Sequence, residues 1–248
     1  MSTTKNDYLS TKPVGPGVLR HTDVHIPPGE PGERLAVFRV GSILRKICFP
    51  KVGDGNPYTA AQWTPRFGTG NAAAESEKGG IKVVASAGYP LDYSLQSVVS
   101  WTPESGKVMA GLFRLVLDDA TAVGFKLGFA NSQNAPFTTN YTDEVVIAKT
   151  AGNAAVDGKV RGDSGTERYT LLLSAQVNVP FDVGFVCAPN QFGKWYVNGK
   201  FIPFTADQMT ELGKLLTTPV SLYLSFAGTS SNNQHVIHWI GGIAEIDN

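Results

Sequence analysis

Hydrophobic and polar residues alternate with a period of two along much of the chain, which is typical of β-strands. The clearest case is DVGFVCAPNQFGKWYVNGK at Asp182 to Lys200, where residues Val183 to Cys187 send alternate side chains to two faces. Pro189-Asn190 predicts a turn, and Trp195 to Val197 are aromatic and β-branched residues that fit a sheet. Asn198-Gly199 is a dipeptide favoured in tight hairpins. The stretch therefore predicts two strands joined by a turn and followed by a second turn.

Other strand-like segments follow one another at the spacing expected of a β-sandwich, separated by turn residues. We predict strands at 81–87, 93–101, 108–117, 124–129, 144–149, 169–174, 221–226 and 236–240. One segment differs, because Met209, Leu212 and Leu216 recur at helical spacing behind a capping residue, Thr205 or Asp207. We therefore predict an all-β antiparallel sandwich with one short helix at 206–216.

The first 80 residues lack regular alternation. Residues 1–32 are rich in proline and glycine, which predicts an extended arm. Residues 34–49 are dense in β-rich apolar side chains and read as two short strands turning at Gly41-Ser42, with a short helix as the alternative. Turn dipeptides at 50–80 break any regular element. We therefore divide the chain into an arm with short strands at 1–80 and a sandwich domain at 81–248.

Composition and charge narrow the function. The chain has 27 Gly, 15 Pro and 17% charged residues, which fits a loop-rich β-protein, and its formal net charge is zero. We therefore expect no nucleic-acid partner, and we expect no membrane partner because no apolar run approaches the length of a membrane span. The start, MSTTKNDYLSTK, is polar throughout, so we expect a protein made in a cytoplasm. Cys48 and Cys187 lie in strand-like segments and are expected to be free thiols rather than a disulfide.

Two loops have chemistry of interest. Asn131, Gln133, Asn134 and Tyr141 belong to an amide- and aromatic-rich loop that could bind a sugar, although amides are also common in any solvated loop. The segment DGKVRGDSG at 157–165 contains the tripeptide Arg-Gly-Asp, but its Gly and Asp residues are those expected of a solvated loop. The histidines, His21, His25, His235 and His238, are not arranged as a metal site. We expect no metal and no cofactor.

The hairpin WYVNGK at Trp195 to Lys200 resembles that of concanavalin A-like, or laminin G-like, β-sandwiches. The resemblance implies a jelly-roll fold. Glycoside hydrolases of this fold carry a Glu-x-Asp-x-x-Glu pattern on one strand, whereas Glu245-Ile246-Asp247 here lacks the second glutamate. No Gly-x-Ser-x-Gly elbow and no phosphate-binding loop occurs either. On these motifs we expect a protein that is not an enzyme.

The second half of the chain also resembles jelly-roll structural proteins of tailed bacteriophage particles, through GFKLGFA at 124–130, DSGTERYTLLL at 163–173, PFDVGFV at 180–186 and the WYVNGK hairpin. This resemblance implies a capsid decoration, or cement, protein of the virion. Its partner would be the major capsid protein or another virion protein, and its assembly a dimer or trimer. The arm would contact the partner through its apolar residues Tyr8, Val18, Leu19 and Ile26. The alternative is a carbohydrate-binding, lectin-like module on a virion surface or fibre.

Overall fold

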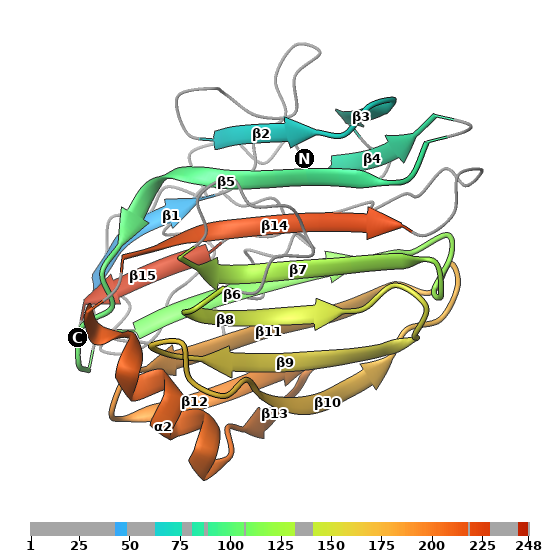
Figure 1. Ribbon diagram of the computed structural model, residues 1–248. Helices are drawn as coiled ribbons and strands as arrows, with labels where there is room; N and C mark the ends of the chain where they lie inside the picture. Colours follow the sequence, from blue (N-terminus) through green and yellow to red (C-terminus); the bar gives the residue numbers. More distant parts are fainter. Residues whose placement is uncertain are drawn as a thin grey trace, which may run out of the picture.

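Two antiparallel sheets pack face to face in the computed structural model, with a helix at one end (Figure 1). The structure describes residues 43–48, 63–75, 81–86, 89–106, 108–131, 141–217, 219–228 and 243–247. The six-stranded sheet has the order β1-β15-β6-β11-β12-β13, the seven-stranded sheet has the order β10-β9-β8-β7-β14-β5-β2, and β3 pairs with β4. The strands are β1 (Ile43–Cys48), β2 (Trp63–Phe67), β3 (Asn71–Glu75), β4 (Ile81–Ala85), β5 (Asp92–Trp101), β6 (Val108–Leu115), β7 (Val123–Ala130), β8 (Glu144–Lys149), β9 (Ala155–Arg161), β10 (Arg168–Ser174), β11 (Phe181–Ala188), β12 (Phe192–Val197), β13 (Lys200–Pro203), β14 (Val220–Gly228) and β15 (Ile243–Asp247).

The described residues confirm the predicted all-β sandwich and its short helix. The predicted helix is α2 (Ala206–Lys214), and a turn of 3-10 helix, η3 (Leu215–Thr217), follows it. Thr205 caps its start through a capping box: the Thr205 hydroxyl accepts a hydrogen bond from the Gln208 backbone N–H at 3.2 Å, and the Gln208 side chain accepts one from the Thr205 N–H at 3.0 Å. No helix in the described ranges is long and apolar enough to cross a membrane.

The central hairpin is formed as predicted. Strand β11 pairs with β12, and β12 then pairs with β13. Asn190 at the first turn and Asn198-Gly199 at the second all have positive φ, at 63°, 44° and 92°. Consecutive positive φ values are what a two-residue hairpin turn requires, and Asn and Gly adopt them at the lowest cost.

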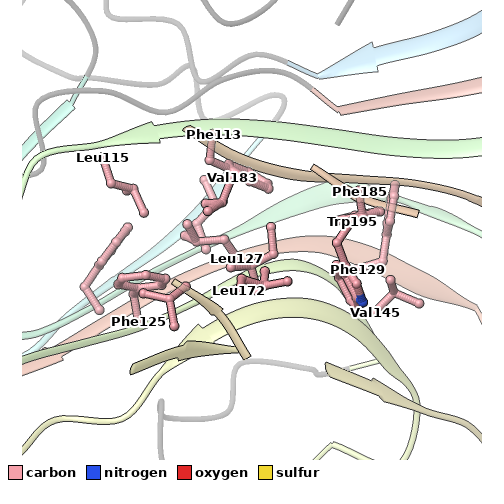
Figure 2. Close-up of a cluster of buried hydrophobic side chains, with 14 of the residues drawn as sticks. Phe113, Leu115, Phe125, Leu127, Phe129, Val145, Leu172, Val183, Phe185 and Trp195 are labelled. Atoms are coloured by element: carbon pink, nitrogen blue, oxygen red, sulfur yellow. The ribbon is translucent and has the colours of Figure 1, made fainter. Parts of the chain in front are cut away.

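The core lies between the inward faces of the two sheets, as Figure 2 shows for side chains of both. Trp195 and Cys187 are both fully buried there, and Cys187 is a free thiol, as expected. The Trp195 ring lies 4.4 Å from that of Phe204 and meets Phe185 edge to face at 6.3 Å. Burial of large aromatic side chains supplies much of the stability of such a sandwich.

Two expectations from the sequence are wrong. Residues 157–165 were expected to be a loop, but β9 runs through Arg161, with Gly158 in its middle. A Cβ atom at Gly158 would lie 2.5 Å from the Trp195 ring, so this glycine serves close packing and not a turn. Turn dipeptides were expected to break any element within 50–80, yet β2 pairs with β5 and β3 pairs with β4 there. In both cases pairing between strands outweighs local turn chemistry.

The proposed division at residue 80 stays a prediction. Strands β1 and β2, which that division assigned to the arm, pair with β15 and β5 in the two sheets. The predicted partner-binding residues of the arm, Tyr8, Val18, Leu19 and Ile26, lie outside the described residues.

Candidate functional site

Charged side chains gather on the outer face of the seven-stranded sheet, the face turned away from the core. On β9, Val156 and Val160 belong to the core, so the alternate residues Asp157, Lys159 and Arg161 point outward. Strands β8 and β10 flank β9 and bring further side chains to the same face by their register. We refer to this region as the β8–β10 outer face.

An ion-pair network crosses this face. Glu167, just before β10, accepts hydrogen bonds from Lys159 Nζ at 2.9 Å and from an Arg161 guanidinium nitrogen at 3.3 Å. The side chains of Lys159, Arg161 and Glu167 are 17%, 17% and 23% exposed, so the network is within reach of solvent but partly shielded from it. Charge-assisted hydrogen bonds to both carboxylate oxygens fix the orientation of Glu167.

A second, buried group of polar side chains lies next to this network. Glu144 on β8 is the cross-strand partner of Arg161 and is fully buried. Its Oε2 atom lies 3.4 Å from Lys126 Nζ of β7, whereas Oε1 has no hydrogen-bond partner among the residues that the structure describes. Lys126 Nζ also lies 4.8 Å from the centroid of the Tyr141 ring, which meets Tyr223 edge to face at 5.2 Å. A cation stacked on an aromatic ring beside a carboxylate is a stabilised arrangement for a buried lysine.

The two glutamates have different proton affinities. Burial raises the pKa of Glu144 above its usual value, and the nearby Glu167 carboxylate adds to this, although Lys126 and Arg161 oppose it. Burial would also raise the pKa of Glu167, but the hydrogen bond and charge of Lys159, with the charges of Arg161 and Lys126, lower it below its usual value. The face therefore holds one carboxyl group that binds its proton more tightly than an ordinary glutamate and one that binds it less tightly.

An exposed aromatic side chain lies at the edge of the same face. Tyr169 on β10 is opposite Lys159 and is 68% exposed, and Leu171 is opposite Asp157 and is 59% exposed. Burial raises the pKa of Asp157, although Lys159 opposes this shift. The β8–β10 outer face thus combines an accessible ring with carboxylate, ammonium and guanidinium groups held on strands.

Two of the four side chains that we predicted to bind sugar are described. Tyr141 lies in the buried group, beside Lys126 and Tyr223. The Asn131 amide donates to Thr142 Oγ1 and, at 3.0 Å, to Asp143 Oδ2, so it braces the ends of its loop. Gln133 and Asn134 lie outside the described residues, and the sugar-binding function of all four stays a prediction.

The Arg-Gly-Asp tripeptide has structural contacts. Arg161 donates to the Tyr141 carbonyl oxygen at 3.0 Å in addition to its bond with Glu167. The Gly162 N–H donates to Glu211 of helix α2 at 3.2 Å, and the Asp163 N–H donates to Asp143 Oδ1 at 2.7 Å. These bonds hold the turn after β9 between the helix and the β8 end of the site.

Within the part of the chain that the structure describes, no three His, Cys, Asp or Glu residues lie close enough together to hold a metal ion. All of the histidines considered above lie outside that part.

The sequence reasoning missed Lys126, Glu144, Glu167 and Tyr169 as site residues. The alternation of charged and small residues at 155–161 predicts a strand with one polar face and could have pointed to Asp157, Lys159 and Arg161, but not to these four.

Comparisons with known proteins identify the fold. No protein-family model matches the sequence, and no curated protein matches it. The solved structures similar to the chain include the carbohydrate recognition domain of Emp46p, at 13% identity and a TM-score of 0.53, covering 80% of this chain and 94% of that one. They also include a Bacillus licheniformis β-glucanase at 14% identity and a TM-score of 0.51, covering 77% and 94%. A third is a structure from the endo-acting O-glycanases of the human gut microbiota, at 14% identity and a TM-score of 0.54, covering 83% of this chain and 99% of that one.

These likenesses require one correction. The prediction that the chain is not an enzyme is wrong, because the fold is shared with a β-glucanase and with O-glycanases as well as with a carbohydrate recognition domain. The missing single-strand motif was a poor criterion, since a sheet can bring carboxylates together from different strands.

The comparisons give no indication of a bacteriophage virion protein. Placement in a virion, a capsid partner and a dimer or trimer stay predictions. What the comparisons show is a concanavalin A-like jelly roll.

Proposed function

We propose that the chain binds carbohydrate on the β8–β10 outer face. The observation that carries this proposal is Tyr169, a largely exposed ring on a strand, beside the Lys159–Glu167 ion pair on the same face. An aromatic ring can stack on the apolar C–H face of a sugar, while carboxylate and ammonium groups bond its hydroxyls. Because the groups are held by a sheet and by one another, little ordering entropy is lost when a ligand binds.

Glycan binding tests the proposal. The full chain is screened on a glycan array, and the dissociation constant of the best ligand is then measured by calorimetry for wild type, Tyr169→Ala and Phe201→Ala. Phe201 is the matched control, because it is an exposed aromatic residue on β13 of the other sheet. We expect Tyr169→Ala to weaken binding about 10- to 100-fold, or about 1.4–2.8 kcal/mol. Equal affinity of wild type and Tyr169→Ala, or the absence of any glycan ligand, contradicts the proposal.

A second candidate function is glycoside hydrolysis by Glu144 and Glu167. The observation that favours it is that their surroundings shift the two pKa values in opposite directions, as a general acid and an ionised partner require. In such a reaction the buried Glu144 side chain would first have to become accessible; it would then donate its proton to the leaving oxygen, and the ionised Glu167 carboxylate would activate the attacking water. The hydroxyl and hydrogen of one water are then added across the broken bond.

Release of reducing ends from β-glucans and from mucin O-glycans tests this second function. We expect Glu144→Gln and Glu167→Gln each to abolish release. Asp207→Asn serves as the control, because Asp207 is a largely exposed carboxylate on helix α2. If Glu144→Gln hydrolyses as fast as wild type, the pair is not catalytic, and glycan binding without hydrolysis leaves the first function alone.

A further inference from the structure

Four side chains of β9 and β10 form a compact array on the β8–β10 outer face. Asp157 lies directly opposite Leu171, and Lys159 lies directly opposite Tyr169. More buried and more exposed residues alternate along both strands here, so these four side chains point away from the core. Opposite side chains in a sheet are about 5 Å apart, and successive outward residues of one strand are about 7 Å apart. The array therefore matches the size of one sugar ring and a substituent.

The cations of this face are already neutralised, whereas one carboxylate is available to a ligand. Lys159 and Arg161 each donate to an oxygen of Glu167. Among the residues that the structure describes, none donates a hydrogen bond to the Asp157 carboxylate or forms an ion pair with it, and this side chain is partly exposed. An ionised carboxylate accepts hydrogen bonds and repels anions. The array therefore suits a neutral ligand that brings an N–H or O–H donor to Asp157.

Leu171 makes an amide a better match for this acceptor than a hydroxyl group. It is 59% exposed and lies directly across from Asp157. An acetamido group carries an N–H donor and, beyond its carbonyl, a methyl group, so the donor can reach Asp157 while the methyl group covers Leu171. Contact between the methyl group and leucine removes apolar surface from water, which stabilises binding. A hydroxyl group in the same place also bonds the carboxylate but leaves Leu171 uncovered.

We infer that the β8–β10 outer face recognises N-acetylhexosamine residues, that is, sugars that carry a 2-acetamido group. The sugar ring stacks on Tyr169, the acetamido N–H donates to Asp157, and the methyl group lies against Leu171. Lys159 stays bonded to Glu167 and keeps the fourth corner of the array in place. This inference rests on the proposed carbohydrate-binding function and adds the class of sugar to it.

A matched pair of trisaccharides tests the inference. Chitotriose and cellotriose have the same ring stereochemistry and the same linkages, and they differ in carrying 2-acetamido or 2-hydroxyl groups. Their dissociation constants are measured with the full chain by ¹H–¹⁵N NMR titration, which detects weak binding and shows which backbone amides shift. The variants are Asp157→Ala, Leu171→Ala and Tyr169→Ala, and the control is Val177→Ala, an exposed apolar residue that follows β10.

We expect chitotriose to bind about ten-fold more tightly than cellotriose, since one apolar contact and one hydrogen bond separate the two ligands. Asp157→Ala and Leu171→Ala should each reduce this ratio to about two-fold or less, because each removes one of those two contacts. Tyr169→Ala should weaken the binding of both trisaccharides, and Val177→Ala should change neither.

Equal affinity for the two trisaccharides, tighter binding of cellotriose or binding of neither would overturn the inference, as would a ratio that Asp157→Ala and Leu171→Ala leave unchanged. The carbohydrate-binding proposal is tested separately, because it still stands if another glycan binds in a Tyr169-dependent manner. If no glycan binds at all, both the proposal and the inference are wrong.

Discussion

Gln208 connects helix α2 to the two strands that carry the proposed carbohydrate-binding face, and its replacement is our most informative stability prediction. Its side chain is fully buried and takes part in five hydrogen bonds. Its Oε1 atom accepts from Trp195 Nε1 at 3.3 Å, Thr170 Oγ1 at 3.2 Å and Thr205 N at 3.0 Å, and its Nε2 atom donates to the carbonyl oxygens of Gly158 at 3.3 Å and Arg168 at 3.5 Å.

The cost of Gln208→Ala follows from the groups that it leaves behind. The Trp195 Nε1–H is buried and would lose its acceptor, which costs about 1–3 kcal/mol. The capping box would lose its return bond to Thr205 N, and Thr205→Ala, which removes the other bond of that box, costs about 1 kcal/mol. We therefore expect Gln208→Ala to lower the free energy of unfolding by about 2–4 kcal/mol and Thr205→Ala by about 1 kcal/mol.

Urea unfolding, followed by far-ultraviolet circular dichroism, measures both costs and allows a double-mutant cycle with Trp195→Phe. Phenylalanine has no N–H, so Gln208→Ala should cost about 1–3 kcal/mol less in that background. The reasoning is refuted if Gln208→Ala costs no more than Thr205→Ala. It is also refuted if Gln208→Ala costs the same with tryptophan and with phenylalanine at position 195.

Three further stability predictions follow from single contacts. Burial lowers the pKa of Lys149 from 10.5 to about 8, so the free energy of unfolding should rise between pH 8 and 10.5, and Lys149→Met should remove the rise. Burial raises the pKa of Cys187, which opposes that rise above pH ~8.5, so the comparison is made in a Cys187→Ala background by urea titrations at each pH. Gly158→Ala should lower the free energy of unfolding by about 1–3 kcal/mol, since its Cβ would lie 2.5 Å from the Trp195 ring, and a melting temperature equal to wild type contradicts that packing. Burial raises the pKa of Glu144 in the folded chain, so the wild type should lose stability as the pH rises through that range. Glu144→Gln cannot ionise, so its melting temperature should increase relative to that of wild type from pH 4 to pH 8. A difference between the two melting temperatures that stays constant with pH argues against the raised pKa.

The elements that sequence reasoning predicted well are those fixed by local chemistry. The central hairpin follows from the alternation at 183–187 and from Asn198-Gly199, whose positive φ values the structure shows. The helix follows from the spacing of Met209 and Leu212 and from the cap at Thr205. Such signals act over a few residues, so they can be read without knowing which strands are neighbours.

Strand β9 shows where local reading fails. Its Asp157, Gly158 and Arg161 are residue types common in turns. They form a strand because β8 and β10 pair with both edges and because the Trp195 ring packs on the Gly158 backbone. The contact with Trp195 cannot be inferred from the nine-residue segment at 157–165, because Trp195 comes from the opposite sheet.

The candidate site depends on strand order even more strongly, which explains why a motif search could not decide about catalysis. Glu144 begins β8 and Glu167 precedes β10, and they approach the same residue, Arg161, only because β9 lies between those strands. A motif confined to one strand places its carboxylates on one face by alternation, whereas here three strands in register do so.

The same arrangement separates the proton affinities of Glu144 and Glu167. Glu144 lies against the buried side of the face, where desolvation dominates, and Glu167 lies where Lys159 and Arg161 can reach both of its oxygens. The candidate site of this chain is therefore specified by the pairing of strands, and a missing linear motif excludes only the arrangement that the motif encodes.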